Sequence, residues 1–132
     1  MKQVFLSLAV VMALVFTGCK DETKKTAETA NLATASFGVR GNCGMCKKTI
    51  EKAANGVEGV ASADWDKAKK KIDVSFNGDK TNTDAIEKAI AASGYDTEHV
   101  AGSEEAYKNL PGCCQYDHNM AMNQTGEAAN HD

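Results

Sequence analysis

Residues 35–60 read ASFGVRGNCGMCKKTIEKAANGVEGV, and this stretch decides the fold. Phe37 and Val39 alternate with small or polar neighbours, as a strand with one buried face requires. From Gly44 onward the apolar positions recur every three or four residues, which predicts a helix. These positions are Cys46, Ile50, Ala53 and Val57. The loop expected between the strand and the helix is short.

The sequence after residue 60 predicts a hairpin, a second helix and a last strand. The hairpin turns at the lysine-rich run 67–71, and its apolar positions alternate on both sides of that turn. They are Ala61, Ala63, Trp65, Ile72, Val74 and Phe76. Thr81 or Thr83 is expected to cap the second helix. The buried positions of that helix are Ile86, Ala89, Ile90 and Ser93, and residues 95–100 supply the last strand.

Residues 35–102 therefore have the order strand, helix, strand, strand, helix, strand. Two helices that cover one face of a four-stranded antiparallel sheet are the usual solution for this order. We predict an α+β domain with a ferredoxin-like βαββαβ sandwich. Residues 103–132 are expected to form a short helix and then a mostly disordered tail from Gln115.

Cys43 and Cys46 stand three residues apart where the first helix is expected to begin. The positive potential of a helix N-terminus favours thiolates at this place. No carboxylate adjoins the pair, and two thiolates suit a soft ion such as Cu(I) or Hg(II). Zn(II) is an alternative that would need more donors, because it prefers four ligands. We therefore predict a metal site at the two cysteines, with Cu(I) as the favoured ion.

A thiol-disulfide oxidoreductase is the main alternative, because residues 43–47 read CGMCK and differ from a thioredoxin-type CGPCK at one position. Thioredoxins carry a tryptophan before this motif and a cis-proline elsewhere, whereas here Asn42 precedes and Pro111 is the only proline. A structural disulfide would close a very short loop and stabilise little. Haem attachment would require a histidine where Lys47 stands.

The cysteine pair and several flanking segments resemble the heavy-metal-associated domain family. Besides Cys43 and Cys46, the matching residues are Val39, Gly41, Ile50–Ala53, Gly56–Val57, Gly59–Val60 and Gly94–Asp96. The family includes copper chaperones, the periplasmic mercury-binding protein and the N-terminal modules of metal-pumping ATPases. Its usual loop reads Gly-Met-Thr-Cys, whereas residues 41–43 here read Gly-Asn-Cys and are one residue shorter.

The resemblance implies a metal carrier that transfers its ion by ligand exchange and catalyses no reaction. The partner would be a metal-transporting ATPase or another metal carrier of the cell envelope. The resemblance also implies that Tyr95 lies in a loop near the metal. Asn42, directly before the first cysteine, is expected to neighbour the ion as well. Met45 is expected to be a loop or surface residue and not a ligand.

Cys113 and Cys114 lie outside the region of resemblance. Adjacent cysteines do not readily form a relaxed disulfide with each other. The pair could add thiolates to the site at Cys43 and Cys46, form a separate metal port, or pair in disulfides. The sequence leaves these three alternatives open. Soft donors further along the chain are too scattered to predict a site; they are His118, Met120, Met122 and His131.

The N-terminal residues 1–18 have the features of an export signal, with Lys2 before a short apolar run. The small residues before Cys19 resemble the lipobox of bacterial lipoproteins, which implies that Cys19 is lipidated. Residues 19–34 are polar and are expected to form a flexible tether. We therefore predict a lipid-anchored protein of the cell envelope, on the periplasmic face or the cell surface.

The composition excludes some functions. The net charge of -3 and the pI near 5.6 argue against nucleic acid as a partner, because no basic face would release counterions from phosphates. The basic run 67–71 is expected to be a solvated turn. The sequence has no Ser/His/Asp set, phosphate-binding glycine loop or carboxylate pair that would indicate an enzyme.

Overall fold

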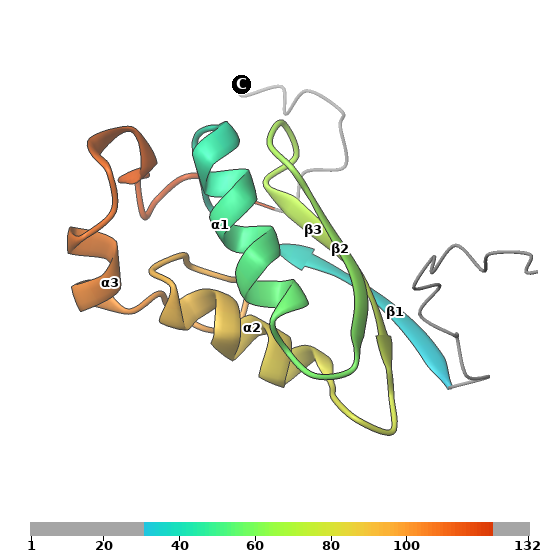
Figure 1. The fold of residues 1–132 in the computed structure, drawn as a ribbon. Coiled ribbons are helices and arrows are strands. Elements are labelled where there is room, and N and C mark those ends of the chain that lie inside the picture. The colour runs from blue at the N-terminus through green and yellow to red at the C-terminus, as the bar shows by residue number, and fades with distance from the viewer. Residues whose placement is uncertain (1–30, 123–132) are drawn as a thin grey trace, which may run out of the picture.

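The computed structural model describes residues 31–122 and consists of a small sheet with helices on one side (Figure 1). The elements are β1 (Leu32–Gly38), α1 (Gly44–Asn55), β2 (Val60–Asp66), β3 (Lys71–Asn77), α2 (Thr83–Ala92), α3 (Glu104–Lys108) and the 3-10 turn η1 (Gly112–Cys114). The predicted leader, Cys19, most of the tether and His131 lie outside the described residues. Among residues 31–122, no helix has both the length and the apolar character needed to cross a bilayer.

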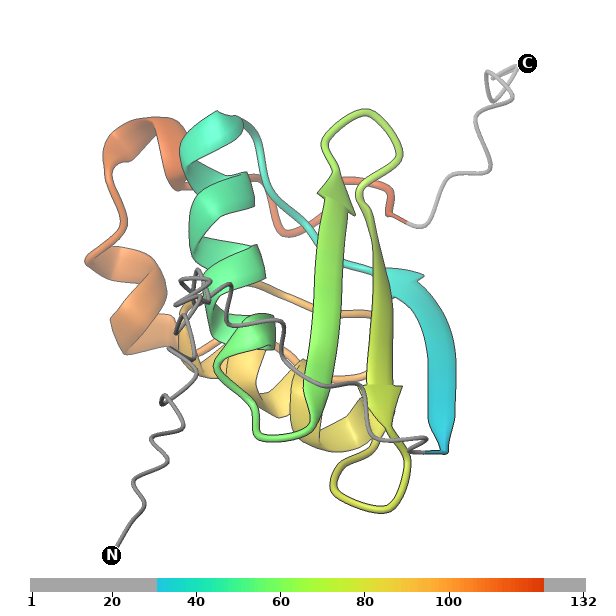
Figure 2. The ribbon, with the colours of Figure 1, turned by 45° about the vertical axis from the view of Figure 1, so that its right-hand side comes forward.

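The strands form an antiparallel sheet in the order β1-β3-β2, and α1 and α2 cover one face of it (Figure 2). Ile72 in β3 lies between Phe37 of β1 and Trp65 of β2, and all three side chains are buried. A register shift between Val60 and Ser62 buries Val60. The expectation that Ala61 is buried was therefore wrong, since the bulge breaks the alternation there.

The predicted fourth strand is reduced to a single antiparallel bridge between Val39 and Thr97. The chain turns immediately afterwards, because the Thr97 N–H donates to the Val100 carbonyl at 2.8 Å. The buried Glu87 carboxylate fixes this turn by accepting from the Thr97 hydroxyl at 2.7 Å and from the His99 N–H at 3.1 Å. The bridge still places the segment beside the end of β1, where the fourth strand of a ferredoxin-like fold belongs.

The core lies between the sheet and the two helices. Helix α1 buries Cys46, Ile50 and Ala54, and α2 buries Ile86, Glu87, Ile90 and Ala91. Each buried isoleucine contributes on the order of 1.5–3 kcal/mol relative to an exposed one. The cap of α2 is neither Thr81 nor Thr83 but Asn82, whose side chain accepts from the Ala85 N–H at 2.9 Å.

The segment after the domain packs against it up to Met122, although residues from Gln115 onward were expected to be mostly disordered. Its α3 is capped by Ser103. The Ser103 hydroxyl accepts from the Ala106 N–H, and the Ser103 N–H donates to the Ala91 carbonyl at the end of α2. Tyr116 is only 1% exposed and belongs to the core. We call residues 103–122 the strap. Figure 1 shows that the part containing α3 and η1 runs alongside α1 and α2.

Candidate metal centre

The loop that leads into α1 is held by Trp65. The indole N–H donates to the Val39 carbonyl at 3.0 Å. A Cβ on Gly41 would lie 3.0 Å from the Trp65 ring and 3.2 Å from the Cys46 Cβ, so only glycine fits between them without a shift. The periodic pattern assigned Trp65 to the core, but it did not reveal that this residue also shapes the metal loop.

Cys43 and Cys46 converge as predicted. Cys43 is the residue that precedes α1, with an extended backbone, and Cys46 lies in the first turn of the helix. Their Sγ atoms are 3.5 Å apart. The Cys46 thiol is buried and accepts from the Asn42 backbone N–H at 3.3 Å, whereas Cys43 is half-buried. The pair is therefore accessible from the Cys43 side.

The environment of Cys43 favours its thiolate. A hydrogen bond from the Cys46 backbone N–H is the main cause, and it lowers the pKa of Cys43 to about 7 although partial burial opposes the shift. Such hydrogen bonds are expected where a thiol precedes the free N–H groups of a helix N-terminus. A substantial fraction of Cys43 is therefore ionised at neutral pH and ready to bind a soft cation.

The strap brings two more thiols to the same place. The Cys43 Sγ lies 3.7 Å from the Cys114 Sγ and 4.0 Å from the Cys113 Sγ. The two strap sulfurs are 3.9 Å apart. Cys43, Cys113 and Cys114 thus form a group whose ligand atoms all lie within 4.8 Å of one another. Cys113 is exposed and Cys114 is buried, and burial raises the pKa of Cys114 to about 12.

Tyr95, which the resemblance placed near the metal, lies beside Cys46 and Cys114. Its side chain is fully buried, and its hydroxyl has no hydrogen-bond partner among residues 31–122. Burial raises the pKa of Tyr95 well above its ordinary range, and negative charge on Cys46 and Cys114 acts in the same direction. The hydroxyl therefore stays protonated and can donate a hydrogen bond to a nearby sulfur that becomes a thiolate.

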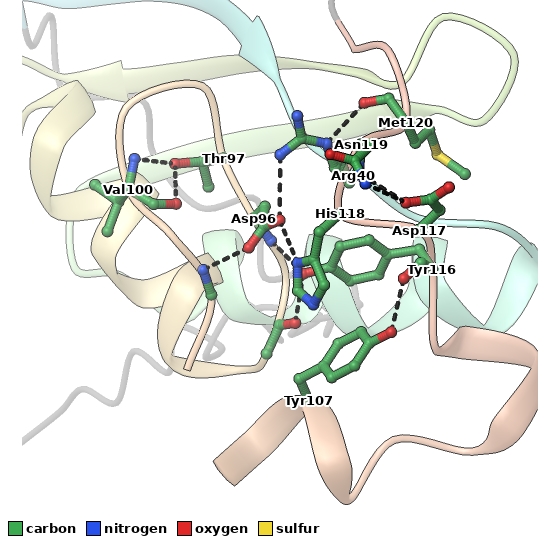
Figure 3. Close-up of polar contacts among 12 residues, drawn as sticks. Arg40, Asp96, Thr97, Val100, Tyr107, Tyr116, Asp117, His118, Asn119 and Met120 are labelled. Atoms are coloured by element: carbon green, nitrogen blue, oxygen red, sulfur yellow. Dashed lines mark hydrogen bonds and ion pairs between the residues drawn. The ribbon is translucent and has the colours of Figure 1, made fainter. Parts of the chain in front are cut away.

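Asp96 anchors the strap to the domain (Figure 3). Its carboxylate accepts from Arg40 at 3.2 Å and lies 2.7 Å from the His118 Nδ1. Its backbone N–H donates to the Tyr116 hydroxyl at 2.7 Å, and that hydroxyl donates to the Gly94 carbonyl at 2.9 Å. His118 therefore has a structural role and is not drawn into the thiol cluster.

Further contacts hold the strap next to the metal loop. The Asn42 side chain, which the sequence placed beside the ion, lies 3.4 Å from the carbonyl oxygens of both Cys113 and Gln115 and donates to them. Arg40 donates to the Met120 carbonyl at 2.7 Å, and Met120 packs against the core. Asn42 thus fixes the position of the cysteine-bearing turn.

Two other expectations concern residues around the cluster. Met45 is exposed, as predicted, but its sulfur lies 3.9 Å from the Cys113 Sγ.

The basic run does form the turn between β2 and β3, yet Lys70 is not simply solvated. Its ammonium group lies 5.6 Å from the centre of the Trp65 ring. Partial burial lowers the pKa of Lys70, while the charges of Cys46 and Cys43 oppose that shift.

Comparisons with known proteins agree with the geometry. Residues 41–96 match the heavy-metal-associated domain family. The copper chaperone CopZ of Staphylococcus aureus is 34% identical over 55 residues, which cover 42% of this chain and 81% of that protein.

Two solved structures are also similar. Oxidized MerP from Ralstonia metallidurans CH34 is 32% identical with a TM-score of 0.49, over 51% of this chain and 94% of that one. A solution structure from Bacillus anthracis str. Ames, 24% identical with a TM-score of 0.50 over 52% of this chain and 100% of that one, shares the fold. The strap cysteines lie beyond the matched residues. The family match over residues 41–96 and the similarity to CopZ lead to one conclusion: the chain belongs to the heavy-metal-associated domain family.

Proposed function

We propose that this protein carries Cu(I) on Cys43 and Cys46 and passes the ion to a partner protein by ligand exchange. The observation that carries the proposal is the convergence of the two sulfurs, 3.5 Å apart, at the start of α1. The similarity to a copper chaperone supports the choice of ion. Thiolates in general select soft ions, so Hg(II) and Zn(II) are the competitors that a test must include.

The pair is suited to capture an ion by a small opening movement. With the zinc–thiolate distance of about 2.3 Å as an upper guide, a linear two-coordinate ion needs its two sulfurs up to about 4.6 Å apart. The observed separation of 3.5 Å must therefore widen by up to about 1 Å. Cys46 is fixed in the helix and buried, so the half-buried Cys43 in the preceding loop is the residue expected to move.

Transfer needs no change of oxidation state. A thiolate of the partner adds to the bound ion and forms a third metal–sulfur bond. One bond to the carrier then breaks, and the released cysteine keeps its electron pair and takes a proton from solvent. Cys43 is the more accessible of the pair, and it is the sulfur that an incoming donor reaches first.

The partner and the location follow from the sequence and are part of the proposal. A metal-transporting ATPase, or another metal carrier of the envelope, would accept the ion. Lipidation of Cys19 would tether the domain to a membrane, and several acyl chains would anchor it stably where one would not. Metabolic labelling with a fatty acid, compared between the full-length protein and Cys19→Ala, tests this part separately.

A metal titration of the reduced full-length protein, under anaerobic conditions and in competition with a chromophoric Cu(I) chelator, tests the central proposal. The Cys43→Ser/Cys46→Ser variant is expected to lose more than about 100-fold in Cu(I) affinity, since even residues outside the ligand set typically contribute 10–100-fold. Lys48→Gln, which changes an exposed residue of α1 two positions after Cys46, is the matched control and should bind as the unaltered protein does.

Retention of tight Cu(I) binding by the double serine variant would overturn the proposal. So would tighter retention of Zn(II) than of Cu(I) in direct competition. Metal-independent reduction of insulin disulfides at a rate typical of thioredoxins would indicate the oxidoreductase instead.

A further inference from the structure

The sulfurs of Cys43, Cys113 and Cys114 form a nearly equilateral triangle. Its sides are 3.7, 4.0 and 3.9 Å. A three-coordinate ion at the centre of such a triangle, with metal–sulfur bonds of about 2.3 Å, requires sides of about 4.0 Å. The triangle therefore has the size of a three-thiolate site without further movement, whereas the Cys43/Cys46 pair must first open to bind an ion in two-coordinate geometry.

This triangle is held in place by the protein and does not depend on a loose chain end. Asn42 holds the backbone of η1, and Tyr116 is buried two residues after Cys114. Asp96 holds the strap through His118 and the Tyr116 hydroxyl (Figure 3). These contacts join the strap to the loop before α1 and to the loop after α2, and so they position the two strap thiols before any ion arrives.

The Tyr95 hydroxyl provides an independent indication of a ligand at this place. A buried hydroxyl without a partner costs roughly 1–3 kcal/mol, so such groups call for an explanation. The sulfurs of Cys46 and Cys114 neighbour this hydroxyl, and a neutral thiol is only a weak acceptor. Coordination to a cation would turn Cys114 into a thiolate, which is a strong acceptor for this hydroxyl.

We propose, building on the function proposed above, that Cys113 and Cys114 bind the same soft ion as Cys43. In this resting site the ion has three thiolate ligands. Before transfer, the ion moves to the Cys43/Cys46 pair, where it has two ligands and from which the partner takes it. Cys43 belongs to both sets, so it keeps its bond while Cys46 replaces the strap sulfurs. Each thiol that binds loses a proton to solvent, and each sulfur that is released takes one back.

The strap thereby changes the role of the domain. In a carrier with two ligands, any competing thiolate can add to the bound ion. In a carrier with three ligands, one ligand must first leave, or the coordination number must rise, before a partner can take the ion. The protein is accordingly a holder of soft metal ions that releases them when its strap thiols are displaced. Nothing within the family match supplies this property, because the match ends at residue 96.

The test uses the reduced full-length protein loaded with one equivalent of Cu(I) under anaerobic conditions. X-ray absorption at the copper edge measures the number of sulfur ligands and the copper–sulfur distance. Chelator competition measures the affinity, and the rate of loss to excess chelator measures retention. The variants are Cys113→Ser, Cys113→Ser/Cys114→Ser and Cys43→Ser/Cys46→Ser. Asn119→Ser is the control, because it replaces an exposed residue of the same strap whose side chain donates a hydrogen bond to Asp117.

We expect three sulfur ligands in the unaltered protein and in Asn119→Ser. The Cys113→Ser/Cys114→Ser variant should have two ligands at a shorter distance, at least about tenfold weaker binding and faster loss of Cu(I). Cys114 is buried, so its replacement can disturb packing. Cys113 is exposed, and Cys113→Ser alone is therefore expected to leave the circular dichroism unchanged and still to lower the ligand number.

Two ligands in the unaltered protein, or unchanged ligand number and affinity in folded Cys113→Ser, would overturn the role of the strap while leaving the proposed carrier function intact. Tight binding by Cys43→Ser/Cys46→Ser would instead overturn the carrier function itself. The two proposals thus fail on different variants.

Discussion

The ring of Tyr116 stacks on the ring of Tyr95, with 5.8 Å between their centroids and 19° between their planes. Tyr116 belongs to the strap, and Tyr95 belongs to the loop that borders the cysteines. This stacking contact joins the strap directly to the loop at the end of the domain. Changes to either ring are therefore expected to affect both the docking of the strap and the thiol cluster.

Tyr116→Ala should release the strap without removing a thiol. Loss of a buried aromatic side chain typically costs about 3–5 kcal/mol, and here local opening of the strap can limit that cost. We expect faster hydrogen exchange and proteolysis in residues 103–122, and alkylation of Cys114, while α1 and the sheet stay protected. Tyr116→Phe keeps the stack and loses only the hydroxyl, so a smaller effect is expected. Equal exchange in Tyr116→Ala and the unaltered protein would contradict this account.

Asp96→Asn should weaken the docking of the strap, because it removes the negative charge that accepts hydrogen bonds there. Burial alone would raise the pKa of Asp96, but hydrogen bonds from the Gly102 N–H and His118 outweigh it and the pKa lies below its ordinary value. The stabilisation is therefore fully present above about pH 4, the ordinary value, and is lost as pH falls through the lower folded value.

Urea unfolding of the metal-free protein at pH 7 and pH 3 measures this effect. Asp96→Asn should cost about 1–3 kcal/mol at pH 7, as expected for hydrogen bonds to a charged group, and less at pH 3. Asp117→Asn, at an exposed acid of the same strap, is the control. The account would be wrong if the two variants lost the same stability at pH 7.

Alkylation of the metal-free protein should distinguish its cysteines by pH. The thiolate is the reactive form, so the rate at Cys43 should rise with pH and reach half its maximum near pH 7, the value set mainly by the Cys46 N–H. Cys114 should remain slow at neutral pH, because burial raises its pKa to about 12. Mass spectrometry after short exposure to iodoacetamide assigns each site. Preferential modification of Cys114 at pH 7 would refute the arrangement.

Gly94→Ala should be strongly destabilising, because Gly94 has a φ of +97° and the backbone of the strap packs closely against its Cα. A Cβ there would lie 2.7 Å from the Tyr107 backbone nitrogen. The backbone conformation alone costs about 1–3 kcal/mol for a non-glycine residue, and the clash adds to it. Gly112→Ala is the matched control, since its Cβ would meet nothing within 4 Å. Thermal melts of the two variants should differ by several degrees, and equal melting temperatures would rule out this explanation.

Much of the domain could be predicted because its signals are local. The alternation around Phe37 and the helical spacing from Cys46 to Ile50 identify a strand and a helix, and the intervening loop then fixes the place of the Cys43/Cys46 pair. The resemblance added Tyr95, which does lie beside the thiols. The sequence predicted a longer fourth strand than the structure has, because its pattern did not reveal the turn at Thr97 that Glu87 stabilises.

The strap could not be predicted for a different reason. Its sequence after Gln115 is polar on average, and a single buried tyrosine gives no periodic signal. Tyr116 is buried because its hydroxyl satisfies groups of Gly94 and Asp96 that lie twenty or more residues away. Such long-range pairings depend on the folded domain, so the three alternatives for Cys113 and Cys114 could not be distinguished from composition. The structure favours one by bringing both sulfurs to Cys43.

Trp65 is the only tryptophan of the chain, and its ring rests against the loop that must move when Cys43 opens. Its indole donates to the Val39 carbonyl within that loop, and Lys70 lies over its ring. An opening of the thiol pair would change the surroundings of the Trp65 ring. We therefore expect the fluorescence of Trp65 to change when an ion binds to or leaves the pair.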